Sequence, residues 1–328
     1  MQPTRRILMA GVLAAALCAP ALSAQAADWP TQKPISYVVP FTVGGSTDVV
    51  GRVIAQKLGE RLHQNVVVEN KPGAAGGIGA AYVAKATPDG YTLFGGTIST
   101  HAINASLYKN LKYDPVKDFE PVSLVATLPN VLLVDPNLGV NSVADLIALL
   151  KRDPAKRTFA SSGAGTSTHL TGELFAGMIG VPLTHVPYKG TPPAMVDVSS
   201  GAVTFMFDQM TAALPLLQTG KLKLLAVTTK NRIKLSPGTP TLAEAGVPGF
   251  DVASWQAVYA PKGTPKPIVD RLSREIAAIL KEPDVQEKLG KTMGMELVGG
   301  TPDKLRDLMA AEIPRWAEVV KQSGASVD

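Results

Sequence analysis

Residues 35–48, ISYVVPFTVGGSTD, decide the fold class. The apolar run 35–40 predicts a buried strand, the glycine-rich stretch 41–47 a loop, and the apolar spacing of 48–62 a helix. A strand that leads into a helix through such a loop is typical of α/β folds. The loop N–H groups lie at a helix N-terminus, which favours an anion. We expect Asp48 to cap this helix.

The same alternation of strand and helix continues to the end of the chain. Further strands are expected at 66–69, 91–95, 158–160, 183–186, 203–207, 223–228, 252–260 and 295–298. Helices are expected at 77–86, 142–152, 168–179, from 191, and at 211–219, 266–281, 283–290 and 302–322. Two apolar runs, 122–125 and 131–134, are separated by Leu128-Pro129-Asn130. This order predicts a mostly parallel sheet.

Composition limits the class of protein. The chain has 328 residues, of which 45% are hydrophobic and 18% charged, so two folded domains are expected. Residues 1–26 read as a secretory signal, with Arg5 and Arg6, an apolar run and the cleavage motif Ala24-Gln25-Ala26. The single cysteine, Cys18, lies inside this segment. Removing the signal leaves 30 basic and 27 acidic residues, a charge of +3 with no basic stripe, which argues against nucleic acid.

Loops at the ends of expected strands are the candidate binding sites. Four of them, 41–48, 95–101, 161–169 and 187–191, are rich in glycine, serine or threonine. Ligands of open α/β sheets lie at the C-terminal ends of the strands. The loop 161–167, SSGAGTS, lies in the second half of the chain and, like 41–47 in the first half, has N–H groups and hydroxyls just before an expected helix. Two such loops predict one anionic ligand held between two lobes.

Catalytic and metal-binding groups are not gathered by any motif. The four histidines, His63, His101, His169 and His185, have no metal-ligand spacing. Ser162, His169 and Asp208 form a triad only on paper, because no nucleophile elbow accompanies them. No stretch matches a P-loop or the full dinucleotide motif. We expect no metal, no cofactor and no catalysis. His101 and His169 either donate to a ligand or brace a loop.

Ordered motifs from residue 40 to the C-terminus resemble one known family. They are PFTVGGSTD (40–48), NKPGAAGGIGA (70–80), PDGYTL (88–93), HAINASLY (101–108), HVPYKGTPPAM (185–195), LAVTT (225–229), PTLAEAGVPGF (240–250) and SWQAVYAPKGTP (254–265). The chain thus resembles the Bug/TctC-type solute-binding proteins of tripartite tricarboxylate transporters. Val43 departs from the pattern, which usually has proline before the glycine pair.

The resemblance implies a type II periplasmic-binding-protein fold, with two interleaved α/β domains joined by a hinge. Residues 27–127 plus 251–328 are expected to form domain 1, and 128–250 domain 2. The implied function is a periplasmic receptor that captures a small carboxylate (a dicarboxylate, amino acid or aromatic acid) and delivers it to the transporter's membrane subunits. The alternative is a ligand-sensing adaptor for a membrane signalling protein. A monomer is expected.

The expected ligand contacts follow from the candidate loops. Their only cation is Lys189, so backbone N–H groups, hydroxyls and water would hold a carboxylate. One carboxylate is assigned to Gly44, Gly45, Ser46 and Thr47, with help from Thr97 and Ser99, and the other end of the ligand to Ser162, Gly165, Thr166 and Ser167. Asp208 is expected to face a ligand donor or bridging water. Phe41 would form an apolar wall, and Tyr188 either extends it or packs at the domain edge.

Overall fold

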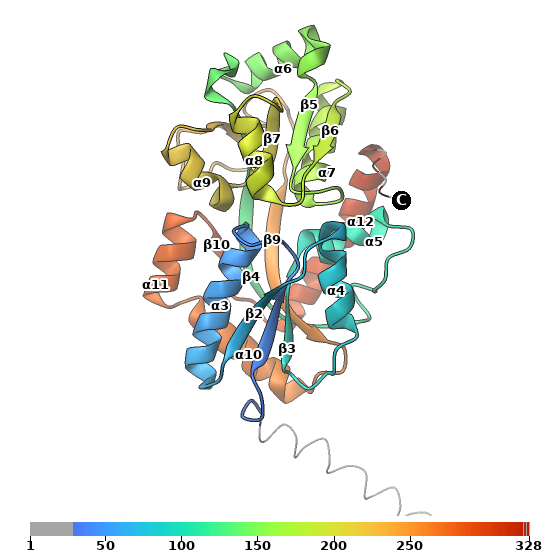
Figure 1. Ribbon diagram of the computed structural model, residues 1–328, viewed down its shortest axis with the longest axis vertical. Coiled ribbons are helices and arrows are strands. Elements are labelled where there is room, and N and C mark those ends of the chain that lie inside the picture. Colours follow the sequence, from blue (N-terminus) through green and yellow to red (C-terminus); the bar gives the residue numbers. More distant parts are fainter. Residues whose placement is uncertain (1–28, 324, 326, 328) are drawn as a thin grey trace, which may run out of the picture.

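The molecule consists of two lobes joined by a pair of long strands (Figure 1). The computed structural model describes residues 29–323, 325 and 327, so the expected signal peptide lies outside the described residues. β4 (Phe119–Val134) and β9 (Ala253–Pro261) run between the lobes. We call the part around β1 (Ile35–Val39) the lower lobe and the part around β5 (Thr158–Ser161) the upper lobe.

The lower lobe is built on parallel strands. β1 pairs in parallel with β2 (Val66–Asn70) and with β3 (Thr92–Thr97). Its helices are α3 (Ser46–Leu62), α4 (Gly77–Ala84), α5 (Asn104–Leu107), α10 (Lys266–Ile279), α11 (Pro283–Val285) and α12 (Pro302–Ser323), with the short helices η1 (Ala74–Gly76), η2 (Ser99–Ile103) and η5 (Gln286–Thr292). Leu58 of α3 and Leu272 and Ile276 of α10 belong to the buried core of this lobe. α10 has its buried side chains at the three- and four-residue spacing of a helix face.

The upper lobe repeats the plan with a second parallel group. β5 pairs in parallel with β6 (Thr184–Pro187) and with β7 (Phe205–Gln209). Its helices are α6 (Val143–Arg152), α7 (Ser167–Ile179), α8 (Thr191–Ser199) and α9 (Met210–Gln218), with η3 (Pro136–Leu138) and η4 (Pro154–Lys156). Ser142 Oγ accepts from Asp145 N at 3.1 Å and so caps the N-terminus of α6.

The strand β4 is continuous, so the break predicted at Leu128-Pro129-Asn130 is wrong. Pro129 pairs with Ala253 at the end of the ladder with β9, and the ladder with β7 begins at the next residue, Asn130. Proline has no N–H to give to a ladder. It therefore stands where the strand changes partners, and β4 extends through it.

The prediction of a mostly parallel sheet is also wrong. Among the described strands the order is β2-β1-β3-β9-β4-β7-β5-β6, and β8 (Lys223–Val227) and β10 (Glu296–Leu297) pair with β4 outside that path. Every pairing of β4, and that of β3 with β9, is antiparallel. The sheet is mixed because the two linking strands run against the parallel groups that they join.

These strands bring loops of both lobes to one place. The segments that follow β1 and β3 belong to the lower lobe, and those that follow β5, β6 and β7 to the upper lobe. The bounds of the two domains and the position of a hinge stay predictions. Within residues 29–323, 325 and 327, no helix has both the length and the apolar character that crossing a bilayer requires.

Candidate functional site

A narrow cavity lies between the two lobes, and hydroxyl, amide and glycine residues form most of its lining. The lower lobe contributes Phe41, Thr42, Gly45, Ser46, Thr47, Thr97 and Ser99, the upper lobe Ser162, Thr166, Ser167, Gly190, Thr191 and Gln209, and the linking strand β9 Ser254 and Gln256. The predicted site residues Phe41, Gly45, Ser46, Thr47, Thr97, Ser99, Ser162, Thr166 and Ser167 therefore line one cavity.

The first loop is fixed by Asp48. The helix α3 begins at Ser46 with Gly45 as its N-cap, so Asp48 is the third helical residue and the prediction that it caps the helix is wrong. Its Oδ2 accepts from Gly44 N at 3.0 Å, and its Oδ1 from Asn70 Nδ2 at 2.9 Å. Arg52 adds an ion pair at 3.0 Å. Burial alone would raise the pKa of Asp48, but these hydrogen bonds and the charge of Arg52 outweigh burial and lower it.

Gly44 does not line the cavity, although it was predicted to bind the ligand. Its N–H is already given to Asp48. Its φ of +85° is in the left-handed region, which suits glycine in this tight turn. Gly44 therefore shapes the loop, while Gly45 and the start of α3 form the wall.

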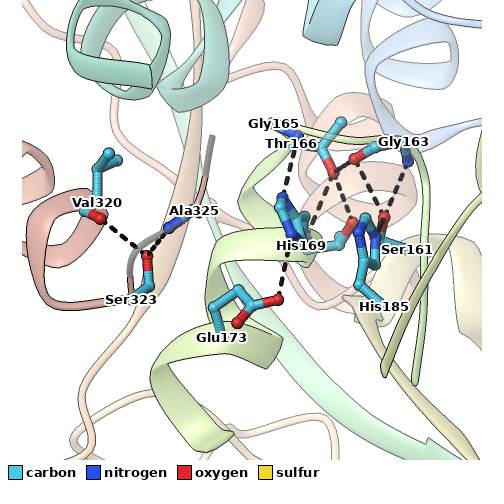
Figure 2. Close-up of polar contacts among 11 residues, drawn as sticks. Ser161, Gly163, Gly165, Thr166, His169, Glu173, His185, Val320, Ser323 and Ala325 are labelled. Carbon is cyan, nitrogen blue, oxygen red and sulfur yellow. Dashed lines mark hydrogen bonds and ion pairs between the residues drawn. The ribbon is translucent and has the colours of Figure 1, made fainter. Parts of the chain in front are cut away.

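The second loop is held from below by His169 (Figure 2). Gly165 N donates to His169 Nδ1 at 3.1 Å, and His169 Nε2 lies 3.3 Å from Glu173 Oε1. Thr166 caps α7, because its hydroxyl accepts from His169 N. Neither Gly165 nor His169 lines the cavity. His169 therefore braces the loop, which is one of its two expected roles. The N–H of Gly165 points to His169 and not into the cavity, although Gly165 was expected to contact the ligand.

A second imidazole supports the same loop. His185 stacks on His169 with ring centroids 3.8 Å apart, and its Nε2 lies 2.6 Å from Ser161 Oγ. Burial, and then the neighbouring His169, lower the pKa of His185 to about 3. His185 is thus a neutral packing group near neutral pH. His101 in the lower lobe is also buried, stacks on Tyr259 and has its pKa lowered to about 3 by burial.

Asp208 and Tyr188 stand behind the cavity wall rather than in it. Asp208 is fully buried, and it accepts from Thr191 Oγ1 at 2.8 Å and from Gln209 N at 2.7 Å. It thus orients two residues that line the cavity. Burial raises the pKa of Asp208 to about 7, against weaker opposing hydrogen bonds. The Tyr188 hydroxyl donates to Asp197, so this ring packs beside α8, which is the second of its two expected roles.

Direct contacts between the lobes close the cavity. Ser46 Oγ donates to Gln209 Oε1 at 3.1 Å, and Ser167 N donates to Ser99 Oγ at 3.0 Å. Gly190 lies against Thr42, where a Cβ would stand 2.2 Å from Thr42 Oγ1. The structure is therefore a closed form in which the walls of the two lobes touch.

Four helices of at least nine residues begin at this cavity. Gly45 and Ser46 start α3, Thr166 and Ser167 start α7, Gly190 and Thr191 start α8, and Gln209 precedes α9. No side chain caps α3, α8 or α9. The lining residues include no aspartate, glutamate, lysine or arginine. Four helix N-termini, each with partial positive charge, thus meet at the cavity, and such an arrangement suits an anion.

Sequence reasoning missed six lining residues: Thr42, Gly190, Thr191, Gln209, Ser254 and Gln256. The first three lie in loops that were singled out as candidates, and Gln209 follows the assigned Asp208. Ser254 and Gln256 lie in β9, two residues apart and on one face. Two polar side chains on one face of a largely apolar strand could have indicated that this face lines a polar site. Among the described residues, no group of three potential metal ligands occurs.

Two lobes on a mixed sheet, closing over a polar cavity at the ends of the strands, define a binding protein of the periplasmic-receptor class. The model of the family "Tripartite tricarboxylate transporter family receptor" (TctC) matches residues 50–325. The protein BugT of Bordetella pertussis is 39% identical over 330 residues, with both chains covered completely. The chain belongs to the TctC/Bug family of solute-binding receptors, which is not a family of enzymes.

Solved structures of relatives have the same fold. The structure described as R. palustris Rpa4515 with adipate has a TM-score of 0.88 at 44% identity, covering 91% of this chain and 99% of its own. The periplasmic binding protein BugD has a TM-score of 0.85 at 38% identity, over 90% and 99%. MatC from Rhodopseudomonas palustris with bound malate has a TM-score of 0.84 at 34% identity, over 89% and 100%. The predicted fold class is thus confirmed.

Proposed function

We propose that this receptor captures a small carboxylate in the cavity between its lobes. One observation carries the proposal: four helix N-termini meet at a cavity whose lining has no charged side chain. A helix N-terminus stabilises a nearby anion by about 0.3–1 kcal/mol when exposed and up to about 2 kcal/mol in partly buried geometries. Several N-termini and neutral hydrogen bonds of about 0.5–1.5 kcal/mol together replace a guanidinium.

Relatives support this choice of ligand class. Rpa4515 and MatC are described with adipate and malate, which are both dicarboxylates. Ser46 and Thr47 at the start of α3 would hold one carboxylate, and Thr166 and Ser167 at the start of α7 the other. The two sites face each other from different lobes, so a ligand that bridges them stabilises the closed form.

Delivery to a tripartite tricarboxylate transporter is the second half of the proposal. The family description supports it, and BugD is described as periplasmic. The chain would be exported by the segment 1–26, act in the periplasm as a monomer, and present its closed form to the membrane subunits. A sensor adaptor would use the same closed form. Capture of the protein by transporter subunits, but not by the outer domain of a sensor, when ligand is present would favour delivery.

Binding itself is tested on protein that has been unfolded, stripped of ligand and refolded. Titration with succinate, malate and adipate is expected to raise the melting temperature, and a ligand at about 100 times its dissociation constant adds about 2.7 kcal/mol to stability. Thr47→Val removes one hydroxyl from the cavity and is expected to weaken binding about 2- to 10-fold.

The control is Thr184→Val, because Thr184 is exposed on β6 outside the cavity. It should leave the affinity unchanged. If no small carboxylate stabilises the refolded protein, the proposed function is wrong.

A further inference from the structure

We call Thr97 and Gln256, which line the cavity from the strands β3 and β9, its floor, and each of them has one buried polar atom without a partner in the protein. Thr97 of β3 and Gln256 of β9 are directly opposed in the antiparallel ladder, so their side chains point to the same face. Both line the cavity, and they are only 5% and 4% exposed. Thr97 Oγ1 and Gln256 Oε1 make no hydrogen bond within the protein. Buried polar atoms are nearly always paired, so these two call for a partner.

The amide of Gln256 is oriented by its neighbours. Its Nε2 donates to Ser46 Oγ at 3.2 Å and to Thr47 Oγ1 at 3.4 Å. The Ser46 hydroxyl donates its own proton to Gln209 Oε1, so its oxygen is the acceptor of the hydrogen bond from Gln256 Nε2. Gln256 therefore presents its NH₂ group to the start of α3 and keeps Oε1 as an unused acceptor.

A carboxylate cannot satisfy that acceptor. An ionised carboxylate offers acceptors only, and Gln256 Oε1 needs a donor. A hydroxyl group both donates and accepts. It can therefore donate to Gln256 Oε1 and accept from the Thr97 hydroxyl, which satisfies both unpaired atoms.

An ammonium group also donates, but the cavity opposes it. The N-termini of four helices place partial positive charge around the ligand. The lining has no carboxylate to balance an ammonium. Two acids stand behind the wall, and both already have partners. Asp208 is buried and accepts from Thr191 and Gln209, while Asp48 accepts from Gly44 and Asn70 and pairs with Arg52. A hydroxyl brings the needed proton without the charge.

We propose that Thr97 and Gln256 make this receptor selective for a carboxylate that carries a hydroxyl group, over both the unsubstituted acid and the matching amino acid. The inference rests on the proposed function and deepens it by naming the ligand class. Thr97 and Gln256 are then the specificity-determining pair, while the helix N-termini bind the carboxylates that all three kinds of ligand share.

The selectivity is tested by calorimetric titration with succinate, both enantiomers of malate, and aspartate. Adipate and 2-hydroxyadipate repeat the comparison for ligands with a longer carbon chain. In the wild type, one enantiomer of the hydroxy acid is expected to bind about 10-fold tighter than the parent acid, and the amino acid more weakly than the hydroxy acid. Gln256→Met should bring the hydroxy and parent acids within about 2-fold of each other.

Thr97→Val is the second variant, since it removes a hydroxyl that bonds nothing in the protein and so leaves folding intact. It should also reduce the preference. Gln56→Met, at an exposed position of α3, should keep the wild-type preference. Three outcomes would overturn this inference alone. The wild type could bind carboxylates without preferring the hydroxy acid, the preference could survive in both cavity variants, or aspartate could bind more tightly than malate. Failure of every carboxylate to bind contradicts the proposed function as well.

Discussion

Gly190→Ala is expected to weaken ligand binding by preventing full closure of the lobes. An added Cβ at Gly190 would stand 2.2 Å from Thr42 Oγ1 and 3.2 Å from Thr42 Cβ and Cγ2. Rotation of Thr42 moves the first atom away but leaves the Cβ in place. Overpacking of this kind costs about 1–3 kcal/mol. If the clash exists only in the closed form, that energy corresponds to a loss of affinity of about 5- to 150-fold.

The same substitution has a second effect that must be separated from the first. Gly190 has φ +123° and ψ 172°, a region essentially restricted to glycine. Alanine there is expected to lower the free energy of unfolding by about 1–3 kcal/mol whether or not the lobes are closed. The double variant Gly190→Ala/Thr42→Ala removes the 2.2 Å contact and keeps the backbone strain.

Calorimetry and urea unfolding measure the two effects independently. We expect Gly190→Ala to lose both affinity and stability, and the double variant to regain most of the affinity but none of the stability. Thr42→Ala alone is the control for the loss of a cavity hydroxyl. An affinity of Gly190→Ala equal to that of the wild type, or a double variant as weak as Gly190→Ala, would refute the contact between Gly190 and Thr42 as a determinant of closure.

Two further predictions concern stability. Burial raises the pKa of Asp208 to about 7. Between about pH 4 and pH 7 the folded state therefore holds a proton that the unfolded state has lost. The free energy of unfolding should fall as the pH rises through this range, by at most about 1.4 kcal/mol per pH unit. Asp208→Asn should flatten this slope in urea unfolding at several pH values, and parallel curves for the two proteins would contradict it. Gly172→Ala would place a Cβ 2.2 Å from the Phe159 ring and should destabilise by about 1–3 kcal/mol, while Gly177→Ala on the same helix has free space and should stabilise by up to about 1 kcal/mol. Equal stabilities of these two variants would argue against the packing of α7 on β5.

The loops of the cavity were predictable because their signal is local. Glycine, serine and threonine between an apolar strand and an apolar helix mark a helix N-terminus, and Ser46, Thr47, Thr166 and Ser167 all lie at such positions. Which N–H groups stay available was not predictable in this way. Asp48 accepts from the N–H of Gly44, because Arg52, one turn further along α3, and Asn70, at the end of β2, hold its carboxylate in place.

The linking strands were harder to predict, because their pairing is set over long distances in the chain. Pro129 lies inside an apolar stretch, and a proline there favours a break in the strand. In the structure β4 changes its pairing at this point, from Ala253 opposite Pro129 to Gln209 opposite Asn130, and the proline stands at that change. Gln256 reads as part of a buried strand. Only its pairing with Thr97 places it on the cavity floor.

The ladder between β4 and β9 constrains how the lobes can move. It extends from the pair Phe119–Pro261 to the pair Pro129–Ala253 and so couples the two chain crossings along their length. Two separate connecting segments would let the lobes swing in many directions. We expect such a paired ribbon to bend and twist as one body, so that opening and closing would follow nearly a single path, and each closure would bring Gly190 back to Thr42 and Ser46 back to Gln209 in the same register.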